Sequence, residues 1–93
     1  MLLTKITITI KTDDVFSLKE KRSVVRNIKN YVQKNFNACI SESHDNDSLR
    51  RIGFTIGILL SHPDELSSIL DTITLHMEEI STGMIENESH DFI

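Results

Sequence analysis

The chain has 93 residues, of which 39% are hydrophobic and 26% charged, and its formal net charge is −4. This length predicts a single domain over residues 1–93, and the composition is too apolar for a disordered chain. The absence of a long apolar run excludes a membrane-spanning helix. One cysteine, Cys39, excludes an internal disulfide and a cysteine-based zinc site, and it fits a reducing cytoplasm.

Charge is distributed unevenly along the chain. Residues 1–36 carry eight Lys or Arg against three Asp or Glu, whereas residues 62–93 carry eight acids and no Lys or Arg. Such an asymmetry bears on partners and solubility rather than on the fold.

The first two predicted elements are a strand and a helix. Residues 3–12 alternate between apolar and polar side chains, which indicates a strand with one buried face and argues against a secretory signal. Ser17 and Glu20 form a capping box at the start of a helix that runs to about Asn35. The predicted apolar stripe of this helix is Leu18, Val24, Val25, Ile28, Tyr31 and Val32.

Two further strands follow and read as a hairpin. The first runs through Ala38 and Ile40 to about Ser43, the polar turn covers residues 44–48, and the second strand covers residues 52–60. Ser61 and Pro63 then mark the start of a second helix. Its predicted stripe is Leu66, Ile69, Leu70, Ile73, Met77 and Ile80.

Gly83 is expected to end this second helix, and residues 84–92 are expected to form a fourth strand that is rich in acids. The β-α-β-β-α-β order predicts an α+β, ferredoxin-like sandwich, in which two helices cover one face of a four-stranded antiparallel sheet. The expected strand order is 4-1-3-2.

This topology leaves one sheet face without helices. Parity assigns to that face the small and polar residues Thr7, Thr9, Gly53, Thr55 and Gly57. Glycine inside a strand often marks close approach of a ligand or another backbone. Two interpretations remain open, which are a solvated face and the interface of a homodimer. The face lacks aromatic side chains, which argues against base stacking on it.

Basic side chains follow one side of the first helix. Lys19, Arg22, Arg26 and Lys29 are spaced by three, four and three residues, and Lys21 is adjacent to them. Such a stripe could bind a phosphate backbone. The alternative is that Glu65, Asp71 or Glu78 of the acidic second helix neutralises part of this charge.

Other chemistry finds little support. His44, Asp45 and Asp47 lie together in the hairpin turn, where such residues usually serve turn geometry rather than a metal. His76 borders the second apolar stripe, which indicates partial burial. No phosphate-binding glycine loop or catalytic motif is present, so we expect neither an enzyme nor a cofactor.

The chain resembles the YlxP-like proteins, an uncharacterised bacterial family. The motif covers residues 17–25 (SLKEKRSVV), and weaker similarity lies at residues 35–38 and at Glu42, Asp47 and Arg51. The chain departs from the pattern at Leu49, where an aromatic residue is common, and at Ile52, where alanine is usual. The resemblance implies the ferredoxin-like sandwich and points to Lys19, Lys21, Arg22, Asp47 and Arg51.

Because members are often encoded beside translation-initiation and ribosome-maturation factors, the resemblance also implies a connection with RNA or the ribosome. We therefore expect a cytoplasmic, non-enzymatic protein that binds ribosomal RNA or ribosomal proteins. The predicted binding residues are Lys19, Lys21, Arg22, Arg26, Lys29 and Arg51. The alternatives are a homodimeric interaction module and, in another class, a small-ligand sensor or enzyme.

Overall fold

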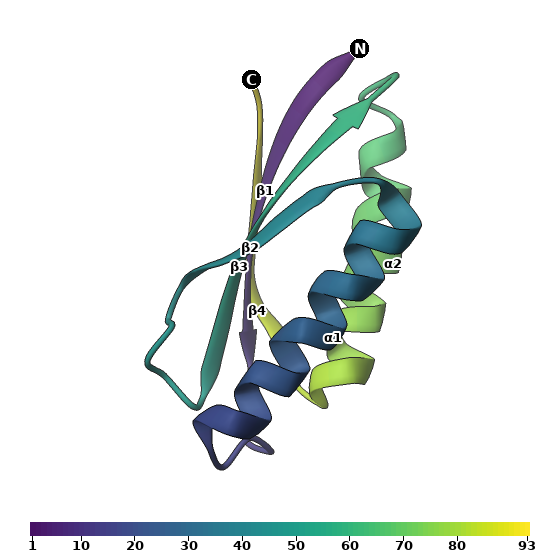
Figure 1. Ribbon diagram of the computed structural model, residues 1–93. Helices are drawn as coiled ribbons and strands as arrows, with labels where there is room; N and C mark the ends of the chain where they lie inside the picture. The colour runs from purple at the N-terminus through teal and green to yellow at the C-terminus, as the bar shows by residue number, and fades with distance from the viewer.

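The computed structural model describes residues 1–93. Its elements follow the chain in the order β1 (Leu2–Lys11), α1 (Leu18–Phe36), β2 (Cys39–His44), β3 (Arg51–Leu60), α2 (Glu65–Ser81) and β4 (Met84–Phe92). The strands form one antiparallel sheet in the order β2-β3-β1-β4. Both helices cover the same face of this sheet (Figure 1). The predicted fold class and strand order are therefore confirmed.

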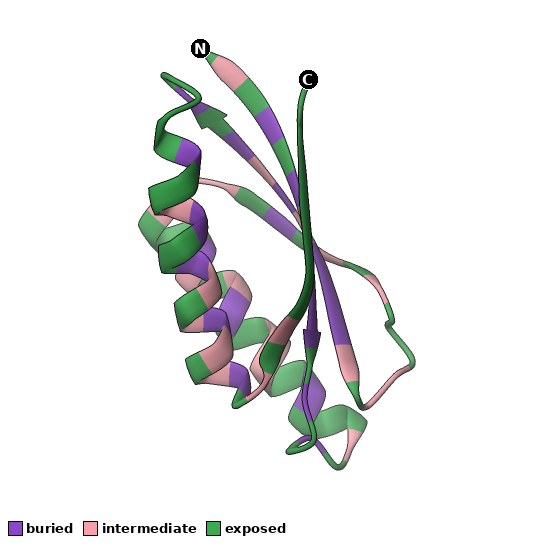
Figure 2. Ribbon diagram, turned by 180° about the vertical axis from the view of Figure 1, so that it is seen from behind, coloured by how far each residue is buried: buried purple, intermediate pink, exposed green.

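Alternation along the strands decides which side chains enter the core. Every second residue of β1 and β3 points toward the helices, and Ile6, Ile8 and Phe54 are fully buried there. Buried residues line the inner sides of the sheet and helices, whereas β4 is largely exposed (Figure 2). The helices complete the core with Ile28, Val32, Leu66, Leu70, Ile73 and Met77.

The first turn of α1 differs from the predicted stripe. Leu18 is 48% exposed, whereas Lys21 is buried with only 3% of its surface accessible. The predicted cap at Ser17 is confirmed, since its Oγ accepts a hydrogen bond from the backbone N–H of Glu20 at 3.1 Å. The Glu20 carboxylate accepts the N–H of Phe16 rather than that of the cap residue.

The ends of α2 also differ from the expectation. Ser61 does not cap this helix, and the Glu65 carboxylate instead accepts the N–H of His62 at 3.0 Å. At the other end Thr82, not Gly83, adopts the left-handed conformation, with φ 52°. A Cβ on Gly83 would lie 2.5 Å from the Lys11 carbonyl oxygen, so the close approach of β1 explains this glycine. Neither helix is long and apolar enough to cross a membrane.

Candidate nucleic-acid interface

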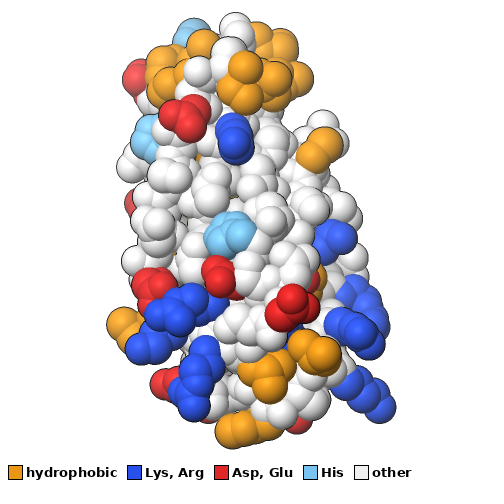
Figure 3. Space-filling model, turned by 90° about the vertical axis from the view of Figure 1, so that its left-hand side faces the viewer, with side chains coloured by type: hydrophobic (Ala, Val, Ile, Leu, Met, Phe, Trp, Pro, Cys, Tyr) orange, Lys and Arg blue, Asp and Glu red, His pale blue; other side chains and the backbone are white.

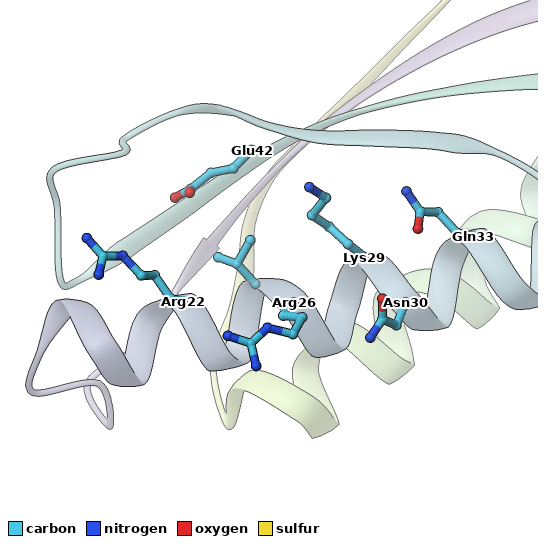
Figure 4. A pocket seen from close by; sticks show the side chains of 7 residues that line it. Arg22, Arg26, Lys29, Asn30, Gln33 and Glu42 are labelled. Carbon is cyan, nitrogen blue, oxygen red and sulfur yellow. The ribbon is translucent and has the colours of Figure 1, made fainter.

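A groove of about 410 Å³ lies between α1 and the edge strand β2. Its lining is mainly polar and consists of Arg22, Val25, Arg26, Lys29, Asn30, Gln33 and Glu42. Arg22, Lys29 and Gln33 extend from the helix toward the strand, and Glu42 extends from the strand toward the helix (Figure 4). Residues three or four apart share one face of a helix, which is why the predicted basic stripe borders a single groove.

The three cations of this groove, Arg22, Arg26 and Lys29, form no ion pairs. All ion pairs within 4.0 Å lie elsewhere, namely Lys21–Glu42, His44–Asp45, Arg50–Asp13 and Arg51–Glu86. The acids of α2 do not reach α1, and Glu78 accepts the backbone N–H of Ile85 at 3.0 Å. The acidic second helix therefore leaves these three charges without a direct partner.

Lys21 has a different role from its neighbours. Its Nζ donates hydrogen bonds to the carbonyl oxygens of Asp45, Asn46 and Ser48, at 2.6, 3.3 and 2.6 Å. Its ammonium also lies 3.2 Å from Oε2 of Glu42. The sequence assigned Lys21 to the partner-binding stripe, and this assignment needs correction because the buried ammonium is used to hold the β2–β3 loop.

Two other predicted residues lie apart from the groove. Lys19 is an exposed residue of α1, one turn before Arg22, and it does not line the groove. Arg51 lies on β3, where its guanidinium bonds both carboxylate oxygens of Glu86 at 2.8 and 3.2 Å. This hydrogen bonding lowers the pKa of Glu86 and raises that of Arg51. The structure thus brings together only Arg22, Arg26 and Lys29 of the predicted set.

On the helix-free sheet face, one histidine covers a glycine. A β-bulge between Glu42 and His44 places His44 opposite Gly53, and a Cβ on Gly53 would overlap the imidazole ring. His44 Nε2 lies 2.7 Å from Oγ1 of Thr9, and Nδ1 lies 2.9 Å from Oγ of Ser43. The Thr55 hydroxyl extends this series of hydrogen bonds, because it donates to Oγ of Ser43 at 2.7 Å. The close approach expected at Gly53 is therefore made within the chain, by His44.

The other glycine of this face stands in open space. A Cβ on Gly57 would meet no atom within 4 Å. Gly57 lines a mainly apolar pocket of about 350 Å³ together with Leu3, Phe36, Asn37, Cys39, Ile58 and Leu59. Figure 3 views the helix-free face and shows hydrophobic side chains toward both of its ends, with a mostly uncharged centre.

The remaining titratable groups form no further constellation. His76 is partly buried, as expected, and its ring stacks on Tyr31 with 4.3 Å between centroids. Cys39 is exposed on β2. His44 Nδ1 lies 2.9 Å from Oγ of the adjacent Ser43, and His44 Nε2 lies 4.0 Å from Oδ2 of Asp45. No group of three His, Cys, Asp or Glu residues converges on a metal-binding arrangement.

These features define a ferredoxin-like domain with a basic edge groove, and solved structures share its fold. A de novo designed protein with ferredoxin fold is 22% identical, with a TM-score of 0.55, and the match covers 100% of this chain and 84% of that one. A dimeric ferredoxin-like protein from an uncultured marine organism is 9% identical, with a TM-score of 0.57 and coverage of 100% and 96%. A protein from Arabidopsis thaliana is 10% identical, with a TM-score of 0.53 and coverage of 98% and 92%.

The chain belongs to the DUF503 family, described as proteins of unknown function, and the match covers residues 3–89. No curated protein matches the chain. Membership of an uncharacterised family is therefore confirmed, while the particular similarity to YlxP-like proteins stays a prediction.

The sequence analysis did not assign the polar residues Asn30, Gln33 and Glu42 to the candidate site, although all three line the groove. Gln33 lies four residues after Lys29, so the helical spacing could have placed it beside the cations. Glu42 was noted only for its weaker family similarity, and its place in the groove could not be predicted, because only the tertiary fold brings its strand against α1.

Proposed function

We propose that this protein is a non-enzymatic, cytoplasmic binding protein that holds single-stranded RNA at the groove between α1 and β2. The observation that supports this proposal is the set of three unpaired cations, Arg22, Arg26 and Lys29, along one groove. Guanidinium groups suit phosphate, because their N–H donors match its oxygens in pairs. Ribosomal RNA or a ribosomal surface is the natural setting that the sequence resemblance implies.

A salt titration tests this function. We expect labelled single-stranded RNA to bind with a log–log salt slope of about −2, since each phosphate contact on a single strand contributes about −0.7. The double substitution Arg22→Glu and Arg26→Glu should weaken binding by more than about tenfold and flatten the slope.

The matched control is Lys19→Glu with Lys34→Glu, which reverses two exposed charges of the same helix outside the groove. This control should lose far less affinity than the groove variant. Equal losses in the two variants would indicate a general charge effect, and salt-insensitive binding would contradict the proposal.

A second candidate function is assembly into a homodimer through the helix-free face. Its support is the apolar pocket at Gly57, together with Leu59, which is 61% exposed beside it. A surface that carries both a protruding apolar side chain and a hollow can pair with a second copy of itself. One of the solved structures with this fold is named a dimeric protein.

Light scattering during size-exclusion chromatography tests the dimer. The expected mass is that of two chains, and Leu59→Glu should reduce it to one. Leu75→Glu on α2 is the control, since Leu75 is similarly exposed, at 54%, but lies on the opposite side of the molecule. A wild-type monomer at micromolar concentration would rule this candidate out.

A further inference from the structure

The groove contains one carboxylate, and its hydrogen-bonding state is unusual. Glu42 extends from β2 into the space where Arg22 and Lys29 point (Figure 4). A carboxylate repels phosphate, so this part of the groove does not suit a phosphate group. Phosphate binding, on which the proposed function depends, therefore does not explain why a carboxylate lies in this groove.

Lys21 balances the charge of Glu42 without satisfying its hydrogen bonding. An ammonium has three N–H donors, and Lys21 directs its hydrogen bonds to the carbonyl oxygens of Asp45, Asn46 and Ser48. Oε2 of Glu42, although 3.2 Å from this ammonium and buried, accepts no hydrogen bond.

The side chain of Glu42 is 22% exposed. Since Oε2 is enclosed, this exposure belongs to the rest of the side chain, which ends in Oε1. The oxygen that lacks a donor is the enclosed Oε2, which a ligand cannot reach. A ligand in the groove therefore meets the exposed part of this charge-balanced carboxylate, where no protein donor competes with it. The group that fits this carboxylate is an uncharged N–H donor carried by a ligand whose phosphates are held by the neighbouring cations.

We propose that Glu42 selects RNA bases that carry an exocyclic amino group and disfavours uracil. This inference rests on the proposed function, because the phosphate contacts bring the base to the groove. Cytosine presents an amino group at N4, which is the group that Asp and Glu accept in known base contacts. Uracil presents a carbonyl oxygen at the same place, which a carboxylate repels. Single-stranded RNA leaves these edges free to be read.

A comparison of two pyrimidine oligonucleotides tests the inference. Oligocytidine and oligouridine of about eight nucleotides have the same backbone and similar base size. We expect the wild-type protein to bind oligocytidine more tightly by about fivefold or more. Glu42→Gln should abolish this preference, because an amide both donates and accepts. Its affinity for oligouridine should be unchanged or higher, since the repulsion is removed.

A modified oligonucleotide tests the same inference on the wild-type protein, so the result does not depend on whether the Glu42→Gln variant folds. Oligocytidine with two methyl groups on each N4 has no amino proton, and the wild-type protein should bind it no better than oligouridine. Binding of all three oligonucleotides with equal affinity would overturn the inference and leave the proposed function standing. Failure to bind any of them, in low salt, would overturn both.

Discussion

Lys21 shows how one side chain can connect distant parts of this molecule. It lies in the basic motif of residues 17–25, yet its ammonium is buried against three carbonyl oxygens of the β2–β3 loop. Loss of one partner of a buried charge pair is costly, because the other charge and the carbonyls lose their compensation. We therefore assign Lys21 to stability and not to partner binding.

Substitution of Lys21 tests this assignment. Lys21→Ala should lower the free energy of unfolding by about 3 kcal/mol, because it leaves the Glu42 carboxylate and three carbonyl oxygens uncompensated. Lys19→Ala, an exposed neighbour, should change stability by less than about 0.5 kcal/mol. Urea denaturation measures both variants. Equal free energies of unfolding for the two variants would show that the Lys21 ammonium does not keep these contacts in solution.

The basic motif also shows the limit of sequence reasoning at single residues. Helical spacing correctly placed Arg22, Arg26 and Lys29 on one face, since that depends only on the period of the helix. The burial of Lys21 depends instead on where the β2–β3 loop lies, and no local pattern contains that information.

At the scale of elements, the two glycines of β3 differ in whether their surroundings require a glycine. His44 occupies the space above Gly53, and the bulge that follows Glu42 brings the ring there. Gly57 lies four residues further along β3, opposite Cys39, and has no neighbour that requires a glycine. From the sequence alone, both glycines were compatible with a solvated face or with the close approach of a partner, because the bulge in β2 could not be predicted.

Alanine substitutions separate the two positions. Gly53→Ala should cost about 1–3 kcal/mol, because the new methyl group displaces the His44 ring from Thr9. Gly57→Ala should be neutral or stabilising by up to about 1 kcal/mol, since the unfolded chain loses freedom. The cost at Gly53 should largely disappear when His44→Ala is added. A persistent cost in this double variant, measured by thermal unfolding, would contradict the ring contact.

The elements themselves were largely predictable. Period-two alternation with β-branched residues defines β1 and β3, and helical periodicity defines α2, because burial of one face repeats with the period of the backbone. The errors lie at the helix ends, at Leu18, Ser61 and Gly83, where individual loop contacts replace periodic burial.

At the scale of the whole molecule, the uneven charge of the chain becomes a separation in space. α1 packs beside β2 and carries the basic residues, whereas α2 packs beside β4 and both are acidic. Because β2 and β4 are the two edges of the sheet, the basic and acidic regions lie at opposite edges. A polyanion is therefore attracted to the α1–β2 edge and repelled from the β4 edge.

The same separation bears on self-association. Pairing of two β4 edges would bring acids together, and pairing of two β2 edges would bring the stripes of α1 together. Charged edges of this kind discourage edge-to-edge pairing of strands. The helix-free face has a mostly uncharged centre and carries the apolar pocket at Gly57 on which the proposed dimer depends.

The location of RNA on the protein is the most direct test of this account. In an NMR titration of ¹⁵N-labelled protein with single-stranded RNA, we expect the amide signals of residues 22–33 and 39–44 to shift and those of β4 to stay in place. These shifts should be absent in the variant that carries Arg22→Glu and Arg26→Glu. Shifts confined to α2, β4 or the helix-free face, or no shifts at all, would contradict the assignment of the α1–β2 groove as the binding site.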